Sequence, residues 1–257
     1  IFKNLDTNIK VNIDEVYLDK ATSVNNLSGD INFKNNNIDK LSLNSNFPNN
    51  KKLTLTIRTN ANKEKITTFY SDYPKPIIQR YKFIKGFEEG VLDFYSIKKN
   101  NFSNSVLKIN NFKVQEVPVL AKLLTLASLQ GIADLLTGEG IRFTDLEMKF
   151  SNKNKLTTIE EMYAIGPAIS ILLDGYIEAE KLVSLRGTLV PATTINKTIA
   201  SIPLLGDILV GKKAGEGIFG VSFKIKGSPK DLKTTVNPIK TLTPRFITRT
   251  LEKIKKD

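Results

Sequence analysis

Apolar and polar residues alternate with a period of two along much of the chain. In the segment 52–59, Leu53, Leu55 and Ile57 fall on one side and polar residues fall between them. Successive side chains of a strand point to opposite faces, so this pattern predicts a β-strand with one apolar face. The same alternation returns elsewhere, with the apolar positions Leu41, Leu43, Phe47, Leu146, Met148, Phe150, Ile169, Ile171, Leu173, Ile177, Val221, Phe223 and Ile225.

Short segments rich in Asn, Lys and Gly separate these blocks, for example 34–37, 44–52 and 151–155. They are typical of turns between neighbouring strands, so the chain is predicted to form a meander of antiparallel strands. The apolar face of such a sheet needs a cover, which can be a second sheet, docked helices, closure into a barrel or an apolar ligand. An ordinary β-sandwich with a self-filled core is the alternative that the pattern alone leaves open.

Helical patterns interrupt the alternation in four places: 73–84, 117–138, 194–210 and 243–256. Prolines open the first and the last of these segments, and Gly138 ends the second. The last segment is basic and amphipathic, so it either packs on the end of the sheet or lies on a membrane surface. The second is the most apolar, but Lys122, Gln130 and Asp134 interrupt it, which favours a buried or interfacial helix over a membrane span.

The stretch "GDILVGKKAGEG" at 206–217 resembles a phosphate-binding loop, with Gly206, Gly211 and Lys212 in the Walker A spacing. Such a loop follows a strand and opens a helix, whereas this stretch is predicted to follow a helix and precede a strand. Lys213 also stands where Ser or Thr would ligate magnesium. A connection between a helix and a strand is therefore the better interpretation.

Composition narrows the chemistry further. The 257 residues contain no cysteine, histidine or tryptophan, which removes thiolate chemistry and the commonest general base and metal ligand. The acidic pairs Glu88–Glu89 and Glu160–Glu161 are adjacent rather than convergent, so solvated charge is the ordinary interpretation. The net charge of +12 suits anionic partners. The lysines of the chain are dispersed and are not interleaved with aromatic residues, which favours a membrane surface over nucleic acid as the partner.

The chain begins with Ile1 and contains neither a signal segment nor a run of eighteen uncharged apolar residues. We therefore expect it to be a segment of a longer protein whose targeting and anchoring parts lie outside it.

Several motifs follow one another along the chain: "PVLAKLLTLASLQGI", "GEGIRF", "GTLVP", "IPLLGD" and "VNPIKTLTPRF". In their order and spacing they resemble the C-terminal part of large AsmA-like envelope proteins of the YhdP type. The resemblance spans nearly the whole chain and is strongest from about residue 105 to residue 247. It divides the chain into a β-groove repeat region, 1–115, and a C-terminal AsmA-like region, 116–257, with helices at about 117–137, 194–210 and 243–256.

The resemblance implies a mainly β fold, in which a long, twisted antiparallel sheet curls into an open apolar groove and helices cap or plug one end. It also implies a periplasmic protein anchored in the inner membrane of a diderm bacterium, which conducts phospholipid toward the outer membrane. Such a protein breaks no bond, so we expect no enzymatic activity, no catalytic residue, no metal and no cofactor. The expected partners are phospholipid, both membranes and an envelope protein. The alternative is a structural or interaction scaffold with a self-filled core; an enzyme with convergent carboxylates is less well supported.

The residues predicted to line the groove follow from periodicity rather than from the resemblance. Each has ordinary core packing as its alternative. They are Leu53, Leu55, Ile57, Met148, Phe150, Ile171, Leu173, Leu185, Leu189, Val221, Phe223 and Ile225. The candidate contacts to membranes or lipid headgroups are Lys212, Lys213, Arg245 and Arg249. The 117–138 segment is hypothesised to be a plug or a membrane-facing tip at the end of the groove. The alternative is an internal core helix, in which case Leu124→Asp would unfold the domain.

Overall fold

A computed structural model describes residues 6–80, 86–191 and 220–239 of the chain. Within these residues it contains thirteen strands and three helices. The strands are β1 (Thr7–Tyr17), β2 (Ser23–Lys34), β3 (Asn37–Asn46), β4 (Lys52–Thr59), β5 (Lys65–Ser71), β6 (Gly86–Lys99), β7 (Phe102–Gln115), β8 (Ile141–Lys153), β9 (Leu156–Ile165), β10 (Ile169–Glu178), β11 (Leu182–Pro191), β12 (Gly220–Ser228) and β13 (Asp231–Ile239). The helices are α1 (Lys75–Ile78), α2 (Pro118–Leu126) and α3 (Gln130–Thr137).

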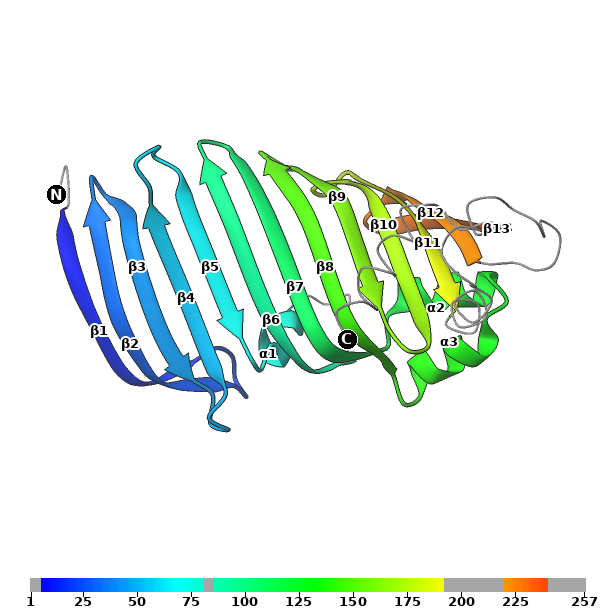
Figure 1. Cartoon of the computed structure of the whole chain (residues 1–257), viewed down its shortest axis with the longest axis horizontal. Helices are drawn as coiled ribbons and strands as arrows, with labels where there is room; N and C mark the ends of the chain where they lie inside the picture. The colour runs from blue at the N-terminus through cyan, green and yellow to red at the C-terminus, as the bar shows by residue number, and fades with distance from the viewer. Residues whose placement is uncertain (1–5, 81–85, 192–219, 240–257) are drawn as a thin grey trace, which may run out of the picture.

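All thirteen strands belong to one sheet, in which each pairs with its neighbour in the sequence. Every pairing is antiparallel, so the predicted mainly β antiparallel meander is confirmed. The sheet is open, with β1 and β13 at opposite ends of the strand order (Figure 1). The expected division between residues 115 and 116 falls directly after β7, and β7 pairs with β8 across it. The sheet is therefore continuous at that point.

Asparagine makes many of the tight connections between strands. Asn35 and Asn36 between β2 and β3, Asn100 between β6 and β7, and Asn154 between β8 and β9 all have φ between 50° and 61°. Asparagine tolerates this left-handed region better than other residues with a side chain, because its amide bonds to the nearby backbone. The Asn-rich segments seen in the sequence therefore act as hairpin turns.

The helix predicted over 117–138 is two helices, α2 and α3, which corrects the single-helix prediction. Ser128 lies between them with a φ of 58°, a conformation that an α-helix cannot contain. Pro118 occupies the first turn of α2, where its missing N–H costs nothing. The short helix suggested within 73–84 is the four-residue α1. The helices predicted at 194–210 and 243–256 lie outside the described residues.

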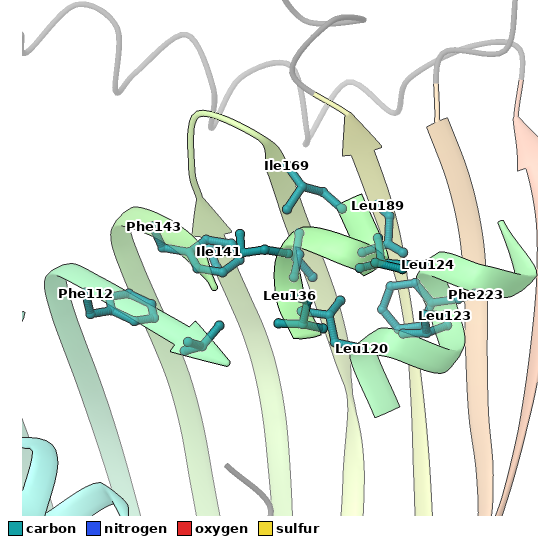
Figure 2. Close-up of a cluster of buried hydrophobic side chains, with 14 of the residues drawn as sticks. Phe112, Leu120, Leu123, Leu124, Leu136, Ile141, Phe143, Ile169, Leu189 and Phe223 are labelled. Carbon is teal, nitrogen blue, oxygen red and sulfur yellow. The ribbon is translucent and has the colours of Figure 1, made fainter. Parts of the chain in front are cut away.

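Helices α2 and α3 share a hydrophobic cluster with strands β6 to β12. Leu124 of α2 and Leu136 of α3 are completely buried. Figure 2 shows Leu123 and Leu124 beside Leu189 of β11 and Phe223 of β12. Leu126 and Leu135, in contrast, are 46% and 43% exposed. The helix pair therefore has one face packed on the sheet and one face open to its surroundings.

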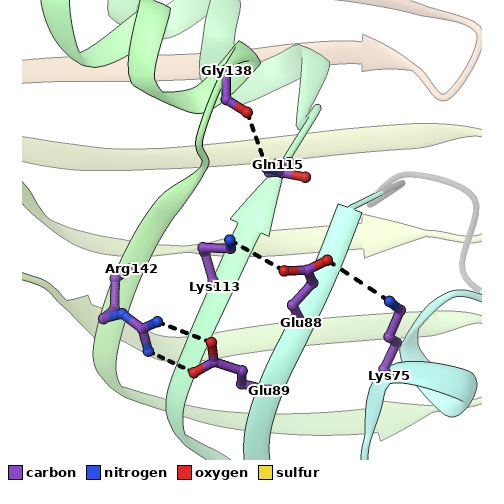
Figure 3. Close-up of polar contacts among 7 residues, drawn as sticks. All are labelled: Lys75, Glu88, Glu89, Lys113, Gln115, Gly138 and Arg142. Atoms are coloured by element: carbon purple, nitrogen blue, oxygen red, sulfur yellow. Dashed lines mark hydrogen bonds and ion pairs between the residues drawn. The ribbon is translucent and has the colours of Figure 1, made fainter.

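Polar contacts fix the ends of β6, β7 and β8 near these helices (Figure 3). Arg142 donates to both carboxylate oxygens of Glu89, at 2.7 and 3.0 Å, and Gln115 donates to the carbonyl of Gly138 at 3.0 Å. Glu88 lies between the ammonium groups of Lys113, at 3.2 Å, and Lys75, at 3.8 Å. Exposed ion pairs of this kind contribute at most about 1 kcal/mol each. They set the geometry of the strand ends more than the stability of the fold.

Among the described residues, no helix combines the length and the apolarity that a membrane crossing requires.

Candidate functional site

One row of residues runs across all thirteen strands without a polar side chain. Directly opposed residues in an antiparallel pair share a face, so the register of each pair extends the row by one strand. We call it the central row, and it consists of Val11, Gly29, Leu43, Leu55, Phe69, Phe94, Leu107, Met148, Met162, Leu173, Gly187, Phe223 and Val236. At ~4.8 Å per strand, its twelve steps make a band on the order of 58 Å long. The face that carries it is called the apolar face below.

The register places all twelve predicted groove residues on the apolar face. Leu55, Met148, Leu173 and Phe223 belong to the central row itself. Two flanking rows hold the other eight: Leu53, Ile171, Leu189 and Val221 on one side, and Ile57, Phe150, Leu185 and Ile225 on the other. Their contact with lipid stays a prediction.

Burial divides these twelve residues into two groups. Five of them are buried in the cluster that includes α2 and α3, namely Ile171, Leu189, Val221, Phe223 and Ile225. These five pack as ordinary core in this arrangement. The other seven, Leu53, Leu55, Ile57, Met148, Phe150, Leu173 and Leu185, are only half-buried. Towards β1 the face opens further, since Ile9 and Ile13 are 44% and 45% exposed.

The apolar face is hollowed between β2 and β8. Two adjoining hollows, each of about 460 Å³, share the lining residues Phe94, Ser96, Lys98 and Ser103. The first also contacts Phe33, Ile57 and Lys65, and the second contacts Phe150 and Asn152. We call the two together the trough. It has an apolar floor and a polar end, and neither of its linings includes a carboxylate.

The opposite face of the sheet carries many polar side chains, with apolar residues such as Ile66 and Ile97 among them. Thr56 and Thr68 are hydrogen-bonded across β4 and β5 at 2.6 Å, and Tyr163 donates to Glu147 at 3.1 Å. Burial raises the pKa of Glu147, but the charges of Lys108 and Lys149 and the Tyr163 hydroxyl outweigh it, and the pKa lies below its ordinary value. The hollow at β9 to β12, about 650 Å³, includes charged side chains such as Asp174 and Arg186, which form an ion pair. Of the two faces formed by the described strands, only the apolar face has a row that stays free of polar side chains across the sheet.

The acidic residues do not form a recognisable reaction centre in the described part of the chain. Glu88 and Glu89 are engaged by the basic residues of Figure 3. Asp145 is buried and accepts a hydrogen bond from the Asn110 amide at 2.8 Å. Between residues 6 and 239, gaps excluded, no group of three or more acidic side chains is arranged to hold a metal ion.

Sequence periodicity missed several residues of this face. Phe69, Phe94, Leu107 and Met162 of the central row were not predicted, because adjacent residues such as Tyr70 and Tyr95 obscure the alternation in their strands. Lys65 and Lys98 were also missed, since nothing in the sequence shows that two strands place them side by side. The candidate headgroup contacts Lys212, Lys213, Arg245 and Arg249 lie outside the described residues, as does the 206–217 stretch.

Comparison of the chain with protein-family models, with curated proteins and with solved structures found no match in any of the three.

Proposed function

We propose that this chain is a segment of an inner-membrane-anchored periplasmic protein of the AsmA-like type, which shields and conducts phospholipid acyl chains between the two membranes of a diderm bacterium. The observation that supports it is the central row, which stays free of polar side chains across thirteen strands. Helices α2 and α3 pack near one end of this row, where Phe223 is buried, and the row members in β1 to β7 are half-buried. An apolar band of this length that is not fully buried is typical of a surface that contacts hydrocarbon or a partner.

The physical basis is the cost of hydrocarbon in water. Each exposed CH₂ group of an acyl chain costs about 0.8 kcal/mol, so a diacyl lipid crosses an aqueous gap only if apolar cover continues along its path. Adjacent strands are ~4.8 Å apart, so an acyl chain contacts several strands at once and reaches the next before leaving the last. No bond is made or broken, and the function needs no catalytic residue.

The second candidate is a non-enzymatic envelope scaffold with a self-filled core. The burial of Ile171, Leu189 and Phe223 under the helices favours it for the region β9 to β13. It does not explain the trough between β2 and β8, which the described side chains leave open.

Adjacent aromatic residues on β6 provide a matched test. Phe94 lies on the apolar face and contributes to both hollows of the trough, whereas Tyr95 is 40% exposed on the opposite face. The chain would be exported to a bacterial periplasm, purified, and examined by native mass spectrometry with lipid extraction. We expect co-purified phospholipid with the wild type and with Tyr95→Asp, and much less with Phe94→Asp.

Both variants introduce the same charge into the same strand, so circular dichroism and thermal melts would establish that each is folded. A folded Phe94→Asp protein with undiminished lipid would contradict acyl-chain binding at the trough. A lipid-free, monodisperse wild type would favour the scaffold instead.

A further inference from the structure

On the apolar face of β5, β6 and β7, the side chains change in regular steps along the strands, from charged to polar to apolar. The directly opposed pairs of β5 and β6, in order along the strands, are Lys65 and Lys98, Thr67 and Ser96, and Phe69 and Phe94. The β7 residues that continue these rows are Ser103, Ser105 and Leu107. Each step spans two residues, or ~6.7 Å, so charge gives way to aromatic rings within about 13 Å. A phospholipid has the same order: a charged phosphate, polar ester groups, then hydrocarbon.

Lys65 and Lys98 form a like-charged pair that the described residues do not neutralise. Direct opposition of like charges in a sheet is destabilising, so the pair is a local cost to the fold. Among the described residues no ion pair involves either ammonium group, although the neighbouring Lys99 lies 4.0 Å from Glu64. Both lysines contact the trough, whose linings hold no carboxylate. An anion bound at this end of the trough would relieve the repulsion.

The row next to the lysines supplies hydrogen-bonding groups. Ser105 donates to Ser96 across β6 and β7 at 2.9 Å, and both side chains are buried. Ser96 accepts this bond, which leaves its own proton for a further acceptor. Both residues line the trough, between the lysines and Phe94. Ester oxygens of a lipid accept hydrogen bonds and donate none, which suits these hydroxyls.

We propose that Lys65 and Lys98 bind the phosphate of an anionic phospholipid, whose ester groups face Thr67 and Ser96 and whose acyl chains lie on Phe69 and Phe94. The inference rests on the proposed function and adds a headgroup preference and an orientation to it. Lipid chains enter the apolar face from the end of the strands that carries Lys65 and Lys98, and the headgroup stays at that end in water.

The test is calorimetric titration of the complete 257-residue chain with three probes: monomeric dioctanoyl phosphatidylglycerol, the matching phosphatidylcholine, and inorganic phosphate. The wild type is expected to bind phosphatidylglycerol about tenfold more tightly than phosphatidylcholine, because the choline ammonium offsets the phosphate charge near the two lysines, and each partly exposed charge interaction is worth up to about fivefold. Lys65→Gln with Lys98→Gln should abolish this preference, and Lys65→Arg with Lys98→Arg should retain it.

The control is Lys40→Gln with Lys153→Gln, which removes two charges from the opposite face. It should keep the preference of the wild type. The variant with both Lys65→Gln and Lys98→Gln should be at least as stable as the wild type, because a repulsive pair has been removed. Lys98→Gln alone, at an exposed position, tests the same site with a smaller change to the fold.

Four outcomes would overturn the inference. If the glutamine variant keeps the preference, or if the wild type binds both lipids equally, the headgroup site is wrong and acyl-chain binding stands. If inorganic phosphate competes at the concentrations at which the lipid binds, the lysines form a site for free anions rather than for lipid. If neither lipid binds, the proposed function fails together with this inference.

Discussion

Replacement of Leu124 by alanine tests whether α2 and α3 are an integral part of the fold. Leu124 is completely buried in the cluster that joins these helices to the sheet. The change removes three carbon groups, which at about 0.8 kcal/mol each is about 2.4 kcal/mol of lost transfer free energy. The cavity left behind adds to this, so the free energy of unfolding should fall by about 3–4 kcal/mol, within the range known for buried leucines.

Leu126→Ala, two residues away in the same helix, is the matched control, because Leu126 is 46% exposed. Its effect should stay within about 0.5 kcal/mol, as for other surface substitutions. Urea unfolding followed by circular dichroism would measure both variants. Equal effects would refute the packing argument and favour a plug that separates from the sheet. A large difference would mean that the helix pair is a fixed part of the folded domain. Its exposed face, with Leu126 and Leu135, would then be the surface available to a membrane or a partner.

Three further substitutions test the packing and the polar contacts of the fold. A side chain at Gly187 would meet the Leu172 carbonyl and the Phe223 ring, so Gly187→Ala should cost about 1–3 kcal/mol in a urea melt. At Gly131 of α3 nothing lies within 4 Å of an added Cβ, and Gly131→Ala should leave stability unchanged or raise it by up to about 1 kcal/mol; the opposite ranking would contradict the register of β10, β11 and β12. The Arg142 hydrogen bonds hold the pKa of Glu89 below its ordinary value. A carboxyl whose pKa is lowered by folding stabilises the fold above the ordinary pKa, and this contribution is lost as the pH falls through the lowered value. Arg142→Gln should therefore return the pKa of Glu89 toward its ordinary value, and the stability difference from wild type should shrink in acid. Carbon-13 NMR titration of the Glu89 carboxyl would measure this, and an unchanged pKa would show that the ion pair does not form in solution.

Much of the architecture could be predicted from the sequence because its determinants are local. Alternation assigned Leu53, Met148, Phe223 and the other groove candidates to one face, since side-chain direction in a strand depends only on position. The Asn-rich turns predicted the antiparallel meander, because turn formation also depends on a few adjacent residues. The break at Ser128 was missed, because a single left-handed residue leaves the helical periodicity on either side intact.

The candidate site depended on pairing, which a single sequence does not display. Whether Ile171 faces an open groove or a helix is decided by where α2 and α3 dock, a contact between distant parts of the chain. The pairing of Lys65 with Lys98 needs the register of β5 and β6, set across more than thirty residues of chain. Periodicity predicts the face on which such a residue lies, but it does not predict which residue of another element lies next to it.

Site-specific photo-crosslinking tests the central claim most directly, because it reports which face of the sheet touches lipid. A benzophenone amino acid would be placed at Phe94 or at Tyr95, which are adjacent on β6 and lie on opposite faces. After irradiation in cells and mass spectrometry of the purified chain, we predict phospholipid adducts at position 94 and none above background at position 95. Equal labelling at the two positions, or labelling at neither, would contradict the proposal that the apolar face carries acyl chains.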